Sequence, residues 1–195
     1  MATQLSDRFD QAMAYTRQLH EGHRRKGTEI PYLSHLLQVA GLVLEHGGTE
    51  DEAIAALLHD AAEDRGGEPV LFEIELKFGP NVAGMVRDNS DSMTENPDSK
   101  DSWRKRKESY LAAISHKSEG SCRVSLADKI HNARSLLSDQ QALGDSHWDR
   151  FNATKEDSAW YYRSLVGAFA TREAEYPALA RLISELRQTV DKLNS

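Results

Sequence analysis

Apolar residues recur at helical spacing through most of the chain, and this periodicity limits the fold more than any other feature of the sequence. No segment shows the sustained alternation of apolar and polar residues that a half-buried strand requires. The spacing therefore predicts an all-α fold. A length of 195 residues suits one sizeable core, so a single domain over residues 1–195 is expected. The clearest stripe follows Pro177 and is predicted to pack into the core; it consists of Leu179, Leu182, Ile183, Leu186, Val190 and Leu193.

Glycine and proline divide this pattern into segments, with breaks expected at Gly47-Gly48, Gly66-Gly67 and Gly79-Pro80. The polar stretch Asp88–Asp101 has few apolar residues and is predicted to be a mobile surface loop. The predicted helices before the C-terminal one are Asp7–Glu21, Ser34–His46, Glu50–Asp64, Pro69–Phe78, Pro80–Val86, Ser102–His116, Ser121–Gln141 and Glu156–Glu173.

Charge and composition exclude several classes of protein. A net charge of −7 argues against a general nucleic-acid binder, which needs a broad basic surface. No apolar run approaches the roughly 18 to 20 residues of a membrane span, and the first residues lack the basic start and apolar core of a signal peptide. The single cysteine, Cys122, rules out an intramolecular disulfide and a thiolate-rich zinc site. A cytoplasmic protein is expected.

A small polyphosphate ligand needs only a local basic pocket, even in an acidic protein. Two runs of basic residues could form one: Arg24-Arg25-Lys26 and Arg104-Lys105-Arg106-Lys107. The second run is more typical of a solvated helix face.

The predicted helix Glu50–Asp64 carries the strongest chemical signal. Its middle is apolar nearly all round, which indicates a buried helix. Four ionisable side chains then follow within six residues: His59, Asp60, Glu63 and Asp64. Buried imidazoles and carboxylates need partners or a cation, because burying them unpaired costs several kcal/mol. His59 and Asp60 are therefore predicted metal ligands, and the two later acids are expected to face whatever binds at the metal.

Adjacent residues on one helix supply only part of a coordination shell, so further ligands must come from elsewhere. His35 and Asp128 are the candidates, because each lies in an otherwise apolar helical context. Two imidazoles and two carboxylates form a nitrogen and oxygen shell without thiolate. This donor set suits Mn²⁺ or another octahedral divalent ion, and leaves Zn²⁺ and Fe²⁺ open.

The order His35, His59-Asp60, Asp128 resembles the metal signature of the HD-superfamily phosphohydrolases. The segments around these ligands are similar to the hydrolase domain of the RelA/SpoT enzymes and to the small alarmone hydrolases. The similar segments are Arg25-Lys26, Pro31-Tyr32, the run from Leu57 to Asp64 and the run from Leu126 to Arg134. The resemblance implies an HD-type helical bundle.

The resemblance also implies an activity, which is hydrolysis of the 3′-pyrophosphate of guanosine tetra- or pentaphosphate, (p)ppGpp. The products would be GDP or GTP and pyrophosphate, with Mn²⁺ as the cofactor. By resemblance, Glu63 and Asp64 would act beside the metal, and Arg25, Lys26 and Asn132 would hold the nucleotide. No synthetase domain fits into this length, so a hydrolase alone is expected.

Two alternatives remain open from the sequence. The chain could be an HD phosphohydrolase of another nucleotide, such as a nucleoside monophosphate, a dNTP or NADPH. It could also be a catalytically silent sensor that binds an alarmone and signals through a partner. The partner in every case is a small-molecule nucleotide, and the oligomeric state is left open.

Other histidines and aromatic residues have simpler interpretations. Histidines outside the signature are more often surface or satisfied core residues than ligands; these are His20, His23, His46, His116 and His147. Trp160, Tyr161 and Tyr162 are predicted to pack a helix rather than to form a platform for a base.

Overall fold

A computed structural model of the chain describes residues 3–90, 101–151 and 153–194. These residues form helices and turns with no β-strand, which confirms the all-α prediction. Within the described residues, extended backbone segments pair at one isolated antiparallel bridge, between Arg24 and Pro31. In order, the α-helices are α1 (Asp7–Leu19), α2 (Leu33–Glu45), α3 (Glu50–Leu58), α4 (Ala61–Arg65), α5 (Gly67–Phe78), α6 (Pro80–Asn89), α7 (Trp103–Ala113), α8 (Glu119–Leu143), α9 (Lys155–Ala170) and α10 (Ala180–Leu193).

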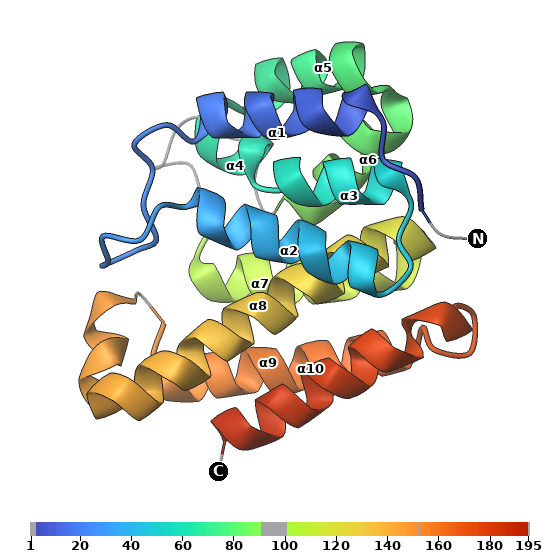
Figure 1. Cartoon of the computed structure of the whole chain (residues 1–195). Helices are drawn as coiled ribbons and strands as arrows, with labels where there is room; N and C mark the ends of the chain where they lie inside the picture. The colour runs from blue at the N-terminus through green and yellow to red at the C-terminus, as the bar shows by residue number, and fades with distance from the viewer. Residues whose placement is uncertain (1–2, 91–100, 152, 195) are drawn as a thin grey trace.

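Helix α3 lies inside the bundle. It contacts α1, α2, α6 and α8, and Ile54, Leu57 and Leu58 are fully buried. Figure 1 shows α3 between α1 and α2, with α8 crossing the molecule towards α9 and α10. The buried apolar residues form one cluster that extends from Ala12 to Leu193. This continuity supports the expectation of a single domain.

Local chemistry explains where several helices begin. Thr49 and Glu52 form a capping box at α3, in which each side chain accepts a hydrogen bond from the backbone N–H of the other. Ser118 caps α8 and Thr154 caps α9 through a single hydrogen bond each, in which the side-chain hydroxyl accepts from a backbone N–H of the first helical turn. At the predicted break Gly79-Pro80, the glycine has a φ of +89° and the proline opens α6.

The predicted helix Glu50–Asp64 is wrong in one respect, because the chain breaks it after Leu58. His59 and Asp60 form a turn between α3 and α4. Asp60 has φ −93° and ψ −4°, in the sparsely populated bridge region where active-site residues are often found. The two acids Glu63 and Asp64 consequently lie on the separate short helix α4.

Other boundaries differ by a few residues. Helix α6 continues to Asn89, so the start of the predicted loop Asp88–Asp101 is wrong, and residues 91–100 of that loop lie outside the described residues. Three short 3-10 helices were not predicted: Ile114–His116, Gly144–Arg150 and Pro177–Leu179. The C-terminal stripe is buried as predicted, through Leu182, Leu186 and their neighbours. Each described helix is too short or too polar to cross a bilayer.

Candidate metal centre

The four predicted ligands come together inside the bundle. His35 lies on the first turn of α2, His59 and Asp60 form the turn after α3, and Asp128 lies in the middle of α8. His59 Nε2 is 3.0 Å from Asp60 Oδ2 and 3.6 Å from Asp128 Oδ1. His35 Nε2 is 3.3 Å from Asp128 Oδ1 and 3.6 Å from Asp60 Oδ2. Two ring nitrogens and two carboxylate oxygens therefore surround one point.

The two histidines are oriented for metal binding. Both rings are buried, and neither Nε2 atom makes a hydrogen bond to the described residues. His59 Nδ1 donates to the carbonyl of Ala56 at 2.8 Å, which orients the ring so that Nε2 faces the carboxylates. His35 Nδ1 lies 2.7 Å from His131 Nδ1. These buried nitrogens without partners fit a divalent cation.

The two carboxyl groups are ionised. Burial by itself would raise the pKa of both. For Asp60, the His59 and His35 rings together outweigh burial, and for Asp128 the Lys129 ammonium and the same two rings together do so, which holds both pKa values well below the ordinary range. The same two acids hold the pKa of His59 well above its usual value, although burial alone would lower it. The two ionised carboxylates therefore favour positive charge between the histidines, and a divalent cation bound there would displace the proton held on His59.

Further hydrogen bonds position the acids. Tyr32 donates its hydroxyl to Asp60 Oδ2 at 2.6 Å, and Lys129 Nζ lies 2.6 Å from Asp128 Oδ2. Asn132 donates to Asp128 Oδ1 at 2.5 Å and accepts a hydrogen bond from Arg25 at 2.9 Å. Asn132, predicted to bind the nucleotide, therefore joins the metal centre to Arg25.

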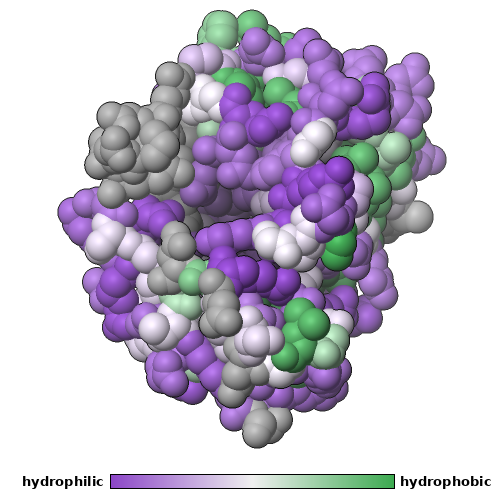
Figure 2. Space-filling view, turned by 90° about the vertical axis from the view of Figure 1, so that its left-hand side faces the viewer, coloured by the Kyte–Doolittle hydropathy of each residue, from purple (hydrophilic) through white to green (hydrophobic). Residues whose placement is uncertain are grey.

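A cavity of about 780 Å³ opens beside the centre. It lies among the segment that joins α1 to α2, helix α4 and the 3-10 helix Gly144–Arg150, on the left-hand side of Figure 1. Figure 2 looks onto this side, which is hollowed and bordered by hydrophilic residues. The predicted site residues that line the cavity are Arg25, Lys26, Asp60, Glu63, Asp64, Asp128 and Asn132.

The basic run Arg104–Lys107 divides between two environments. Arg106 and Lys107 line the cavity, and Arg106 Nη1 is 3.9 Å from Glu63 Oε1. Arg104 instead stacks on the ring of Trp160, 3.2 Å from its centroid. Tyr161 and Tyr162 are buried, as the packing interpretation predicted, and both also line the cavity.

Sequence reasoning assigned no role to Tyr32, Lys129 or His131, each of which contacts a predicted ligand. A signal existed for Lys129, since it follows Asp128 directly in an apolar helix. Among the remaining histidines, His116 is exposed, while His46 and His147 lie 3.0 Å and 2.8 Å from carbonyls of their own helical turns. His116 and His46 match the simpler interpretation, whereas His147 is buried and its Nε2 atom has no hydrogen-bond partner in the described chain.

Comparison with known proteins gives the family. The HD domain family model matches residues 12–149. The chain is 34% identical over 142 residues to the guanosine-3′,5′-bis(diphosphate) 3′-pyrophosphohydrolase MESH1 of Drosophila melanogaster, covering 70% of this chain and 73% of that protein. It is 31% identical over 169 residues to the mouse (Mus musculus) protein of the same name, covering 85% and 87%.

Longer proteins and solved structures agree. The bifunctional (p)ppGpp synthase/hydrolase SpoT of Escherichia coli K12 is 31% identical over 141 residues, which are 66% of this chain and 18% of that protein. A solved structure described as a metazoan ortholog of SpoT that hydrolyses ppGpp has a TM-score of 0.76 at 26% identity, covering 98% of both chains. One from Listeria monocytogenes EGD-e has a TM-score of 0.66 at 27% identity, covering 80% of this chain and 96% of that one. The chain belongs to the HD-domain family, and its resemblance to the (p)ppGpp hydrolases is confirmed.

Proposed function

We propose that this chain hydrolyses the 3′-pyrophosphate of (p)ppGpp to GDP or GTP and pyrophosphate, with Mn²⁺ as its cofactor. The observation that carries the proposal is the quartet of His35, His59, Asp60 and Asp128, which is buried except for the partly exposed Asp60 and whose two carboxylates line a cavity that also holds acidic and basic side chains. The activity for which the related proteins are named supports the choice of substrate.

The donor set supports the choice of cofactor. Two imidazoles and two carboxylates suit Mn²⁺, and their position beside the cavity leaves room for water and substrate. A divalent cation held there would supply Lewis acidity, lowering the pKa of a water ligand and polarising a phosphoryl oxygen.

Glu63 and Asp64 are the proposed acid–base pair. Both lie on α4, directly after the His59-Asp60 turn, and both line the cavity. In the proposed reaction, water attacks the phosphorus attached to ribose O3′, the bond from this phosphorus to O3′ breaks, and pyrophosphate leaves. One carboxylate takes the proton of the water, and a proton is delivered to O3′.

Basic side chains on the same cavity bind the phosphates. Arg25 and Lys26 line the cavity together with Arg106 and Lys107. A guanidinium can bind two phosphate oxygens at once, and Arg25 is held in place by its hydrogen bond to Asn132. We therefore assign Arg25 and Lys26 to phosphate binding and Asn132 to the positioning of Arg25.

The proposed partner is this small-molecule nucleotide, without nucleic acid or membrane. We propose the cytoplasm as the location, because the single cysteine, Cys122, is buried and forms no disulfide, as in proteins of reducing compartments.

A direct assay tests the proposal. Purified protein incubated with ppGpp and Mn²⁺ is expected to release pyrophosphate and GDP. His59→Ala should abolish turnover, because it removes a ligand, whereas His116→Ala, at an exposed position, is the matched control and should keep full activity. Absence of turnover with each of several divalent metals would overturn the proposal.

Two other outcomes identify the alternatives. Release of phosphate from a nucleoside monophosphate, a dNTP or NADPH, with ppGpp untouched, would assign a phosphohydrolase of another nucleotide. Tight binding of ppGpp without hydrolysis, unchanged in Glu63→Ala, would assign a sensor.

A further inference from the structure

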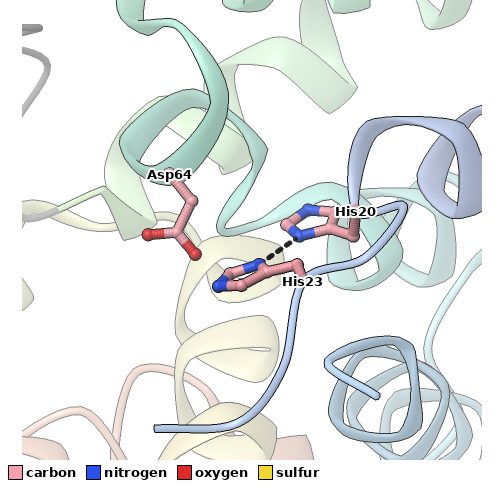
Figure 3. A group of neighbouring side chains, drawn as sticks. All are labelled: His20, His23 and Asp64. Carbon is pink, nitrogen blue, oxygen red and sulfur yellow. Dashed lines mark hydrogen bonds between the residues drawn. The ribbon is translucent and has the colours of Figure 1, made fainter.

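A second group of metal-ligating side chains lies next to the quartet. His20 ends α1, His23 follows in the next turn, and Asp64 comes from α4. Each offers one ligand atom, and these atoms lie within 4.8 Å of one another. Figure 3 shows the carboxylate of Asp64 directed at the two imidazole rings. The predicted interpretation of His20 and His23 as surface or satisfied core residues does not explain this convergence.

The His20 ring is incompletely satisfied. His20 is only 4% exposed, and its Nε2 atom is buried with no hydrogen-bond partner in the described chain. Its Nδ1 atom lies 3.0 Å from Nδ1 of His23. A neutral His20 ring therefore carries its proton either on the buried Nε2, without an acceptor and at a cost of roughly 1–3 kcal/mol, or on Nδ1, where it faces the Nδ1 of His23.

Both rings are neutral at pH 7. Burial lowers the pKa of His20 to about 4, although Asp60 opposes this effect, and burial also lowers the pKa of His23. A neutral imidazole has one unprotonated nitrogen that can bind a metal. A hydrogen bond between the two Nδ1 atoms, which lie 3.0 Å apart, needs one proton, and a cation bound between the rings can take the place of that proton.

We propose that His20, His23 and Asp64 bind a second divalent cation, so that the centre holds two metal ions. Two imidazole nitrogens and one carboxylate oxygen suit Zn²⁺, Co²⁺ or Mn²⁺. Three protein ligands leave positions open for another ligand, and Asp64 lines the cavity where such a ligand would bind. With Asp64 bound to this cation, the carboxylate that takes the proton of the water in the proposed reaction is Glu63.

One tyrosine connects the two sites. The His23 ring stacks on Tyr32 with the ring centroids 4.2 Å apart, and the Tyr32 hydroxyl donates to Asp60 Oδ2 at 2.6 Å. Neighbouring cations on one side of a cavity are a common device for binding polyphosphates. The second cation would therefore also bind phosphate oxygens of the substrate. This role rests on the proposed function, whereas the cation site itself is independent of the proposed function.

Metal stoichiometry tests the proposal without any turnover. Protein stripped by a chelator and titrated with Co²⁺ is expected to bind two equivalents. His23→Ala and His59→Ala should each bind one, and the double variant should bind none. His116→Ala, which removes an exposed histidine outside both groups, should still bind two. One equivalent in the wild type, or two in His23→Ala, would overturn the proposal.

A second measurement keeps both proposed ligands intact. In His59→Ala, addition of paramagnetic Co²⁺ should shift the NMR signals of the His20 and His23 rings, while the signal of His116 stays in place. Unshifted His20 and His23 signals would contradict the proposal even if the titration showed two equivalents. Neither readout depends on ppGpp, so an inactive enzyme would overturn the proposed function and leave the second site standing.

Discussion

The two ring nitrogens of His35 have different partners, and this difference orients the ring. Nε2 faces the carboxylates of Asp60 and Asp128, whereas Nδ1 lies 2.7 Å from Nδ1 of His131. Burial lowers the pKa of His131 to about 4, so its ring is neutral and can accept a hydrogen bond from His35. That hydrogen bond keeps the Nε2 lone pair of His35 directed at the metal centre.

His131 is therefore a positioning residue, and its removal should weaken cation binding. We expect His131→Ala to lower the affinity for Mn²⁺ by roughly 10- to 100-fold, the usual effect of losing a partner of a metal ligand. Titration followed by electron paramagnetic resonance measures this affinity. The affinity for Mn²⁺ should fall less in His131→Gln, which keeps a hydrogen-bond acceptor, and should be unchanged in His116→Ala. Equal affinities for wild type and His131→Ala would contradict the assignment.

Helix α3 ends directly before His59 and Asp60, and this break brings the two side chains together. On a continuous α-helix, neighbouring residues i and i+1 project about 100° apart and do not face each other. The break at Asp60 allows His59 Nε2 and Asp60 Oδ2 to approach to 3.0 Å. A regular helix over Glu50–Asp64 would have separated the two ligands.

Helix α8 contributes through one face. Asp128, His131 and Asn132 are spaced i, i+3, i+4, so their side chains lie together, and all three line the cavity. The same helix contacts α10, which carries the C-terminal apolar stripe. Packing of α10 against α8 thus holds in place the helix that carries Asp128.

The capping box of α3 gives a test at the scale of one element. Thr49→Ala removes the hydroxyl that accepts from the N–H of Glu52, at an exposed position where no cavity is created. We expect the free energy of unfolding to fall by about 1 kcal/mol in urea titrations, with no change in the slope. Thr49→Ser keeps the hydroxyl and should be nearly neutral. If the free energy of unfolding fell as much in Thr49→Ser as in Thr49→Ala, the loss of stability would not come from the missing cap.

The proposed metal centre joins distant parts of the molecule, because α2, the turn after α3 and α8 each supply part of the proposed quartet of ligands. A cation that binds only the folded chain stabilises it by about 2.7 kcal/mol at a hundredfold excess over Kd. In a protein of this size, that corresponds to a rise in the melting temperature of roughly 5–10 °C.

Thermal unfolding with and without Mn²⁺ measures this linkage. The wild type should melt at a higher temperature with Mn²⁺ than in chelator. In Asp128→Asn, which weakens the anionic donor set, the rise should be clearly smaller, whereas in Thr49→Ala it should be the same as in the wild type. An equal rise in Asp128→Asn would place the stabilising cation outside the quartet.

Much of this molecule could be predicted from its sequence. Apolar spacing determined the helices, since each helix buries one face and the spacing that this requires is local. The metal ligands His35, His59, Asp60 and Asp128 could be nominated because ionisable residues in apolar helical contexts need partners or a cation. The pattern of these residues also led to the HD-domain family, which the comparisons confirm.

Only the tertiary structure decided how these residues meet. The contact of His131 with His35, the hydrogen bond from Arg25 to Asn132, and the convergence of His20 on α4 have no local signal. Each depends on how helices distant in sequence cross and how deeply they bury their ends. Apolar periodicity determines which face of a helix is buried, but it does not determine which residues of another helix lie opposite that face.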